Sequence, residues 1–162
     1  MKKKKLLLIA LLLVGAASSF AAKVDTLLVK SPSMNKDIKV VVVTPDAALG
    51  KKATACPTVY LLHGFGGHAK TWIEIKPNLP QIADEKGIIF VCPDGKNSWY
   101  WDSPENPAYR YETFVTSELV KYTDGNYATI PDRKARAISG LSMGGHGALW
   151  SAIRHKDVFG AA

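Results

Sequence analysis

The sequence predicts an α/β fold in which parallel strands alternate with helices. The runs TVYLL at residues 58–62 and IIFVC at 88–92 are continuously apolar, as are strands buried on both faces of a parallel sheet. A third apolar strand is expected at 135–139, followed by a helix rich in Gly and Ala at 143–154. Strands and helices that alternate in this way imply right-handed crossovers, with helices on both faces of the sheet.

The remaining elements follow from periodicity and turn residues. Residues 25–30 and 38–44 are β-rich and flank a polar turn with a proline, which predicts an antiparallel pair at the start of the domain. Residues 46–55 form a polar connector. A helix with an irregular start is expected within 72–86, because Pro77 and Pro80 forbid one regular rod. After a long loop at 93–110, apolar residues at helical spacing predict an amphipathic helix over 112–122.

The first 21 residues have the pattern of a secretory signal peptide. Lys2 to Lys5 are basic, residues 6–14 are apolar, and Ser19-Phe20-Ala21 predicts cleavage after Ala21. The cleaved protein would be secreted or periplasmic, without stable membrane association; an uncleaved anchor is the alternative. Removing four lysines and no acids lowers the net charge from +7 to +3, so the basic balance gives little reason to expect a nucleic-acid partner. Residues 22–162 then make at most one domain.

Export would permit a disulfide, and Cys56 and Cys92 are the two cysteines available. Cys56 opens one predicted strand and Cys92 closes another, which places them on the order of 15 to 20 Å apart in a parallel pair. We therefore expect two buried, unpaired cysteines.

Residues 140–144, GLSMG, match the pattern G-x-S-x-G between an apolar strand and a helix. This arrangement presents a serine nucleophile, Ser142, on a sharp turn at the N-terminus of a helix. Gly140 and Gly144 are needed because neighbouring backbones approach too closely for side chains at these positions. The N–H of Met143 is the first candidate donor to an oxyanion.

A second oxyanion donor is expected from HGFGG at 63–67, which follows the strand at 58–62. Gly64 allows a tight turn, so the N–H of Phe65 can point at the oxyanion. The two motifs, each after a buried strand, together indicate acyl-transfer chemistry at Ser142.

The four histidines are poor candidates for the general base that Ser142 needs. His146 and His155 lie on the helix that leaves the serine, about 6 and 20 Å along its axis, and are expected to pack or face solvent. His63 and His68 flank the oxyanion loop, and His63 is expected to hold that loop by hydrogen bonds. No third ligand of suitable spacing accompanies His63 and His68, so neither a metal nor a cofactor is expected. Asp94 and Asp102 are acids in the loop at the same edge but have no histidine to orient.

Several motifs together resemble the esterase family of α/β-hydrolases, which includes S-formylglutathione hydrolases (esterase D), feruloyl and acetyl-xylan esterases, tributyrin esterases and the secreted mycolyltransferases. The resemblance covers roughly residues 24–162. It rests on YLLHGFGG (60–67), Trp72, FVCPDG (90–95), NSWYWDSP (97–104), YETFVTSELVKY (111–122) and ISGLSMGGHGAL (138–149).

The resemblance implies the N-terminal part of an α/β-hydrolase fold, with Ser142 as nucleophile and the N–H groups of Phe65 and Met143 as oxyanion hole. It also implies that the remaining triad members, an acid and then a histidine, lie beyond the nucleophile by many tens of residues. They are therefore expected beyond Ala162, and a truncated chain is the simplest interpretation.

Trp99, Tyr100 and Trp101 lie in the loop at the catalytic edge and are candidate substrate contacts; the alternative is that they only pack the loop. The leading hypothesis is a secreted serine esterase that acts on carboxylic esters, such as acetyl or feruloyl esters on carbohydrate, through a Ser142 acyl-enzyme. Two alternatives stay open. One is an acyltransferase of the mycolyltransferase type, and the other is an inactive or non-catalytic carbohydrate-binding fragment.

Overall fold

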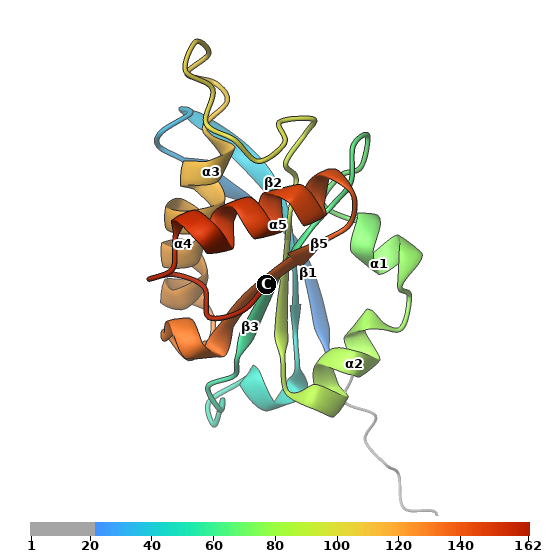
Figure 1. Cartoon of the computed structure of the whole chain (residues 1–162). Helices are drawn as coiled ribbons and strands as arrows, with labels where there is room; N and C mark the ends of the chain where they lie inside the picture. The colour runs from blue at the N-terminus through green and yellow to red at the C-terminus, as the bar shows by residue number, and fades with distance from the viewer. Residues whose placement is uncertain (1–21) are drawn as a thin grey trace, which may run out of the picture.

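The structure of the chain, a computed structural model, describes residues 22–162. The predicted signal peptide lies outside the described residues. Five strands form one mixed sheet in the order β1-β2-β4-β3-β5. The helices lie on both sides of it (Figure 1), which confirms the predicted α/β class. The strands are β1 (Lys23–Ser31), β2 (Lys36–Thr44), β3 (Thr58–Leu62), β4 (Ile89–Pro93) and β5 (Arg136–Gly140).

The sheet has an antiparallel beginning and a parallel remainder, as the sequence predicts. Strand β1 pairs with β2 and β2 pairs with β4, both antiparallel, whereas β3 is parallel to β4 and β5. Beyond β5, Ala161 forms a parallel bridge to Ala137, and the N–H of Ile138 donates to the carbonyl of Ala161 at 3.0 Å. The carboxyl ends of β3, β4 and β5 thus meet at one edge of the sheet, where ligands bind in open α/β sheets.

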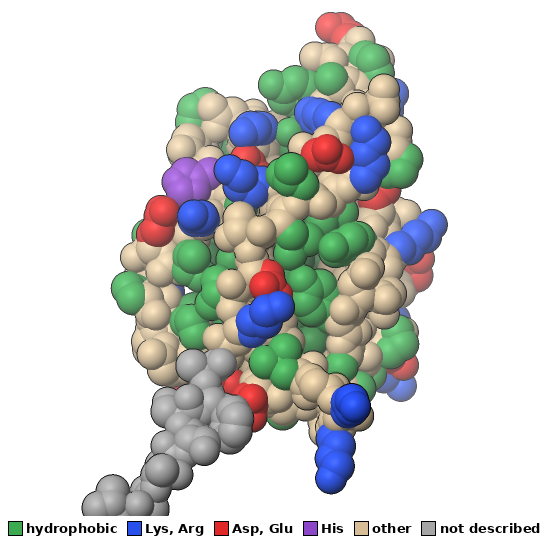
Figure 2. Space-filling view, turned by 180° about the vertical axis from the view of Figure 1, so that it is seen from behind, with side chains coloured by type: hydrophobic (Ala, Val, Ile, Leu, Met, Phe, Trp, Pro, Cys, Tyr) green, Lys and Arg blue, Asp and Glu red, His purple; other side chains and the backbone are tan. Residues whose placement is uncertain are grey.

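Two separate cores cover the two faces of the sheet. Alternate strand residues point to opposite faces, so Val40 and Tyr60 join one cluster and Val41 and Leu61 join the other. The first core is covered by the helices α3 (Tyr111–Thr113), α4 (Leu119–Asn126) and α5 (Met143–Arg154), and the second by α1 (Thr71–Ile75) and α2 (Leu79–Lys86). Seen from behind, the surface carries hydrophobic patches between charged side chains (Figure 2).

Helical regions differ from the sequence expectation in detail. The predicted helix within 72–86 is two helices, separated at Pro77 and Asn78, with Pro80 in the first turn of α2. The predicted helix 112–122 runs from Tyr111 to Asn126 through a π-helical segment, Phe114–Glu118. Short 3-10 helices occur at Asp46–Ala48 and Arg133–Ala135.

Both cysteines are buried and free, as expected. Burial raises the pKa of the Cys92 thiol to about 12, so this side chain remains an uncharged hydrophobic group at neutral pH. No helix between Ala22 and Ala162 has the length and hydropathy of a membrane span. Residues 22–162 likewise contain no group of three or more His, Cys, Asp or Glu side chains placed to hold a metal ion.

Candidate active site

Ser142 lies on the turn between β5 and α5, where the backbone is strained. Its φ of 52° and ψ of −118° lie outside the regions that side-chain-bearing residues favour. The turn is closed by Gly144 N–H donating to the carbonyl of Leu141 at 2.8 Å. Ser142 precedes the first residue of α5, and its hydroxyl makes no capping hydrogen bond. Ser142 is also solvent-exposed, at the carboxyl edge of the sheet.

The glycines of this turn are required by contacts with backbone atoms. A Cβ on Gly140 would lie 2.3 Å from the carbonyl oxygen of Gly144, and a Cβ on Gly144 would lie 2.2 Å from that of Leu62. These distances are far below van der Waals contact. The start of α5 is thus seated directly on the ends of β3 and β5, which places Ser142 above the sheet.

The HGFGG loop lies against this turn. A Cβ on Gly64 would approach Leu141 Cδ1 to 2.7 Å and Ser142 Cβ to 3.5 Å, so no side chain separates the loop from the serine. Gly67 N–H donates to the carbonyl of Gly64 at 3.0 Å, and Gly66 has a φ of 77°. This combination is that of a type II turn, with Phe65 at its second position. Phe65 is 65% exposed, so its ring is not part of the core.

His63 holds the HGFGG loop by hydrogen bonds, as expected from the sequence. Its Nδ1 lies 2.7 Å from the carbonyl oxygen of Gly64, and its Nε2 accepts a hydrogen bond from Gly95 N–H at 2.9 Å. Because Nε2 accepts this bond, Nδ1 is the nitrogen that can donate to the Gly64 carbonyl. Asp94 is farther from Nε2, at 3.6 Å, and pairs instead with Lys96 at 2.8 Å. A buried imidazole that already uses both nitrogens is not available as the base for Ser142.

The other histidines and the second acid have structural partners. His155 Nε2 bonds Glu112 at 2.8 Å, and the exposed His68 lies 3.6 Å from Glu74. His146 packs among tryptophans one turn beyond the serine. Asp102 accepts from Thr113 N–H at 3.0 Å and from the Thr113 hydroxyl. Among residues 22–162, none of these groups forms a nucleophile–base pair with Ser142.

The three aromatic residues at 99–101 separate into two kinds. Tyr100 is fully buried, and a Cβ on Gly95 or on Gly147 would lie within 2.5 Å of its ring. Its hydroxyl donates to the carbonyl of His63 at 3.3 Å. Tyr100 as a substrate contact is therefore wrong: its ring fills a slot between the β4 loop and α5.

Trp99 and Trp101, by contrast, are about half exposed, at 46% and 47%. Their rings lie 5.5 and 5.4 Å from the His146 ring, and Trp101 lies 5.5 Å from Trp150. The four rings form an aromatic cluster along the first two turns of α5, beginning one turn from Ser142. Such a surface can stack on a planar acyl group or a sugar ring.

Two supporting residues were not anticipated from the sequence. Asn97 Oδ1 accepts from Gly66 N–H at 2.8 Å and so ties the HGFGG loop to the loop after β4. Glu112 is buried and accepts from Trp150 Nε1 and Arg154 Nε, each at 2.8 Å, besides its bond to His155. Burial opposes its ionisation, but these three hydrogen bonds outweigh burial and lower the pKa of Glu112. For Glu112, the available sequence signal was an acidic residue at the start of a predicted amphipathic helix.

Comparison with known proteins agrees with this geometry. The family described as "Putative esterase" matches residues 31–162. An acetyl esterase of Caldicellulosiruptor saccharolyticus is 31% identical over 63% of this chain and 38% of its own length. A diacylglycerol acyltransferase/mycolyltransferase of Mycobacterium leprae is 35% identical over 84% of this chain and 41% of its own.

Solved structures give the same picture. A ferulic acid esterase matches with a TM-score of 0.72 and 32% identity, over 86% of this chain and 58% of that one. An S-formylglutathione hydrolase of Agrobacterium tumefaciens matches with a TM-score of 0.75 and 25% identity, over 88% and 57%. The chain therefore spans about two fifths of these curated relatives and somewhat more than half of these solved chains.

Proposed function

Because the chain belongs to the esterase family of α/β-hydrolases, we propose that Ser142 is the nucleophile of a serine esterase that forms an acyl-enzyme. The observation that carries the proposal is the strained Ser142 backbone, seated on the ends of β3 and β5 with the Gly64 loop against it. A local strain of this kind is kept where the surrounding structure fixes it, and such positions cluster at reactive sites.

In the proposed reaction, Ser142 Oγ attacks the acyl carbonyl carbon and passes its proton to a base. The carbonyl oxygen becomes an oxyanion that accepts hydrogen bonds from the N–H groups of Phe65 and Met143. The alcohol then leaves with a proton, and water hydrolyses the acyl-enzyme to release the acid. We place the base and its orienting acid in sequence that would follow Ala162, since the chain spans only 38% and 41% of the length of its curated relatives.

Trp99 and Trp101 support an ester whose acyl or alcohol part carries a ring. Both are half exposed beside the first turn of α5, and the relatives include proteins named as acetyl and ferulic acid esterases. We therefore propose acetyl or feruloyl esters on carbohydrate as the substrate class. Among small molecules, an aromatic acid ester would profit most from the aromatic cluster.

The experiment is ester hydrolysis with short-chain nitrophenyl esters and methyl ferulate, combined with mass spectrometry after treatment with a fluorophosphonate. The expected result is negligible turnover by the 162-residue chain, and turnover with a covalent adduct on Ser142 by a version extended with an acid and a histidine from a relative. An adduct on another residue, or turnover by the extended form that survives Ser142→Ala, would refute the proposal.

An acyltransferase is the second candidate, favoured by the 35% identity to the mycolyltransferase of Mycobacterium leprae. In that reaction a sugar or lipid hydroxyl replaces water in attacking the acyl-enzyme. Assaying the extended version with an acyl donor, with and without a sugar acceptor, distinguishes the esterase from the acyltransferase. Transfer product in excess of free acid would favour the transferase, whereas binding of carbohydrate without turnover by either form would favour the non-catalytic alternative.

We further propose export with cleavage after Ala21. Ala22 is buried, and its backbone N–H donates to Asp84 Oδ2 at 2.7 Å. Cleavage after Ala21 would turn this nitrogen into an α-ammonium group already placed against a carboxylate. The N-terminal sequence of the exported protein, read by mass spectrometry, should begin at Ala22; an intact Met1 on exported protein would contradict the proposal.

The oxyanion role of Phe65 predicts a large effect of removing one N–H group. In the version extended with an acid and a histidine from a relative, Phe65→Pro is expected to lower kcat by about 100- to 1000-fold. Proline has no N–H to donate to the oxyanion. Phe65→Ala is the matched control, since it keeps the N–H and removes only an exposed ring. Equal kcat values for the two variants would remove Phe65 from the oxyanion hole.

A further inference from the structure

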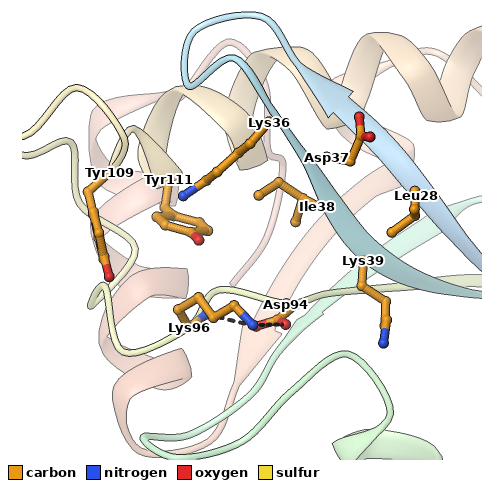
Figure 3. A pocket seen from close by; sticks show the side chains of 9 residues that line it. All are labelled: Leu28, Lys36, Asp37, Ile38, Lys39, Asp94, Lys96, Tyr109 and Tyr111. Carbon is orange, nitrogen blue, oxygen red and sulfur yellow. Dashed lines mark hydrogen bonds and ion pairs between the residues drawn. The ribbon is translucent and has the colours of Figure 1, made fainter.

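We propose that the pocket between the β1–β2 hairpin and the loop before α3 binds a small oxyanion-bearing molecule, a carboxylate or a phosphate on a sugar-sized body. The pocket has a cavity volume of about 360 Å³, and its lining residues include Lys36, Lys39, Asp94, Lys96, Tyr109 and Tyr111 (Figure 3). This volume lies at the lower end of the range for small-molecule sites.

Lysine side chains supply the charge. Lys36 enters the pocket from the start of β2, with Nζ 4.9 Å from the centre of the Tyr111 ring and 5.1 Å from that of Tyr109. Its ammonium donates to the carbonyl of Ala108, and no carboxylate among the described residues lies within ion-pair distance of it. Burial first, and then the charge of Lys96, lower the pKa of Lys36. An anion placed beside Lys36 would favour its charged form and so offset both effects.

The pocket also has an unused hydrogen-bond donor. The Tyr111 side chain is fully buried, and its hydroxyl has no hydrogen-bond partner within residues 22–162. Figure 3 shows this ring beside Lys36, with the hydroxyl toward the lining residues Ile38 and Asp94. Burial, followed by the charge of Asp94, raises the pKa of Tyr111 to about 12, so the hydroxyl keeps its proton. A buried hydroxyl without a partner destabilises the folded protein, and an oxyanion that accepts a hydrogen bond from it would remove this penalty.

The charges on the lining residues favour an anion over a neutral sugar. Three lysines face two carboxylates, and Asp94 is already neutralised by Lys96 at 2.8 Å. Besides the exposed Lys39, the remaining donors are Lys36 Nζ and the Tyr111 hydroxyl, which match the acceptor-only chemistry of a carboxylate or phosphate. The half-exposed Tyr109 ring, at 39%, forms a wall against which the body of such a ligand can pack.

This pocket does not include the candidate active site. None of Ser142, Phe65 and Met143 lines it. In the sheet order, β2 is three strand spacings from β5, which is roughly 14 Å. Asp94 connects the two regions, because it belongs to the pocket and precedes Gly95, whose N–H bonds His63. The inference therefore does not depend on Ser142 being a nucleophile.

Isothermal titration of the purified protein with glucuronate, glucose 6-phosphate and glucose tests the inference. At least one acid is expected to bind while glucose does not, and which acid binds identifies the carboxylate or phosphate as the preferred group. Lys36→Gln should weaken acid binding by about tenfold or more, since a charge-assisted bond is lost. Lys86→Gln, an exposed lysine at the end of α2 and the other end of the sheet, is the control and should bind like the unmodified protein.

Tyr111→Phe is a second variant that we expect to fold, because it keeps the ring and removes only the unpartnered hydroxyl. We expect an unchanged or higher Tm together with acid binding weakened about three- to tenfold. Binding of glucose as tight as that of the acids would overturn the proposal. Absence of acid binding, or acid binding that neither Lys36→Gln nor Tyr111→Phe weakens, would overturn it as well.

Discussion

Replacing Ser142 in the catalytically active form is expected to abolish ester hydrolysis, with kcat lowered by about four orders of magnitude or more. The two useful substitutions should differ in stability. Ser142→Ala removes the nucleophile and keeps a side chain at a φ of 52°, whereas Ser142→Gly removes both the nucleophile and the strain. Because the Ser142 hydroxyl caps nothing, neither variant loses a hydrogen bond to the helix. Ser142→Gly should therefore raise the free energy of unfolding by about 1 kcal/mol relative to Ser142→Ala.

Hydrolysis assays and urea unfolding of the two variants, followed by circular dichroism, measure both effects. A Ser142→Gly variant that is more stable than Ser142→Ala would show that the native turn stores strain at the position of the proposed nucleophile. Equal stability of the two variants would mean that the turn relaxes around Ser142 and stores no strain. Residual activity in both would mean that the acyl group is carried by another residue.

Gly144→Ala is expected to prevent the native turn from forming. The added Cβ would lie 2.2 Å from Leu62 O and 2.7 Å from His63 O, and both atoms belong to backbone at the end of β3. Backbone cannot move aside as a flexible side chain can, so α5 must shift away from the sheet. We expect the free energy of unfolding to fall by about 4 kcal/mol or more, the range of severe single substitutions.

Gly125→Ala is the matched control, because it makes the same chemical change within α4 where nothing lies within 4 Å of the added Cβ. Alanine has the higher helix propensity, so this variant should be as stable as the unmodified protein or more stable by up to about 1 kcal/mol. Urea midpoints of the two variants give the comparison. A mild Gly144→Ala, within about 1 kcal/mol of Gly125→Ala, would contradict the close seating of α5 on β3.

Those parts of the fold that depend on local pattern could be predicted from the sequence. The strand at 58–62 and the helix at 143–154 have the predicted bounds, because continuous apolar runs and glycine-punctuated turns are local signals. The placement of Ser142 on the turn before that helix was likewise predicted, from the glycines at 140 and 144. Prolines also indicated an irregular region before α2, although they did not show that the chain forms two separate helices there.

Features that depend on distant partners could not be predicted. Tyr100 is buried because Gly95 and Gly147, separated by 52 positions in the chain, together leave a slot for its ring. The neighbouring Trp99 and Trp101 carry the same aromatic signal and stay half exposed. Similarly, the partners of Glu112 lie 38 to 43 residues away, and the π-helical segment beside it has no signature in the apolar spacing. The sequence identified the three aromatic residues as candidates but did not indicate the direction of their side chains, and it did not single out Glu112.

The Glu112 carboxylate has a mechanical consequence for the serine. Helix α5 has 12 residues, so it is about 18 Å long. Glu112 accepts hydrogen bonds from Trp150 and Arg154 in the second half of this helix. Gly140 and Gly144 fix where the helix begins, while Glu112 fixes its tilt. A rotation of α5 by about three degrees about its C-terminal end would displace Ser142 by close to 1 Å. A displacement of that size would lower the rate of the proposed ester hydrolysis roughly a hundredfold. The position of Ser142, the proposed nucleophile, thus depends on contacts made at the opposite end of α5.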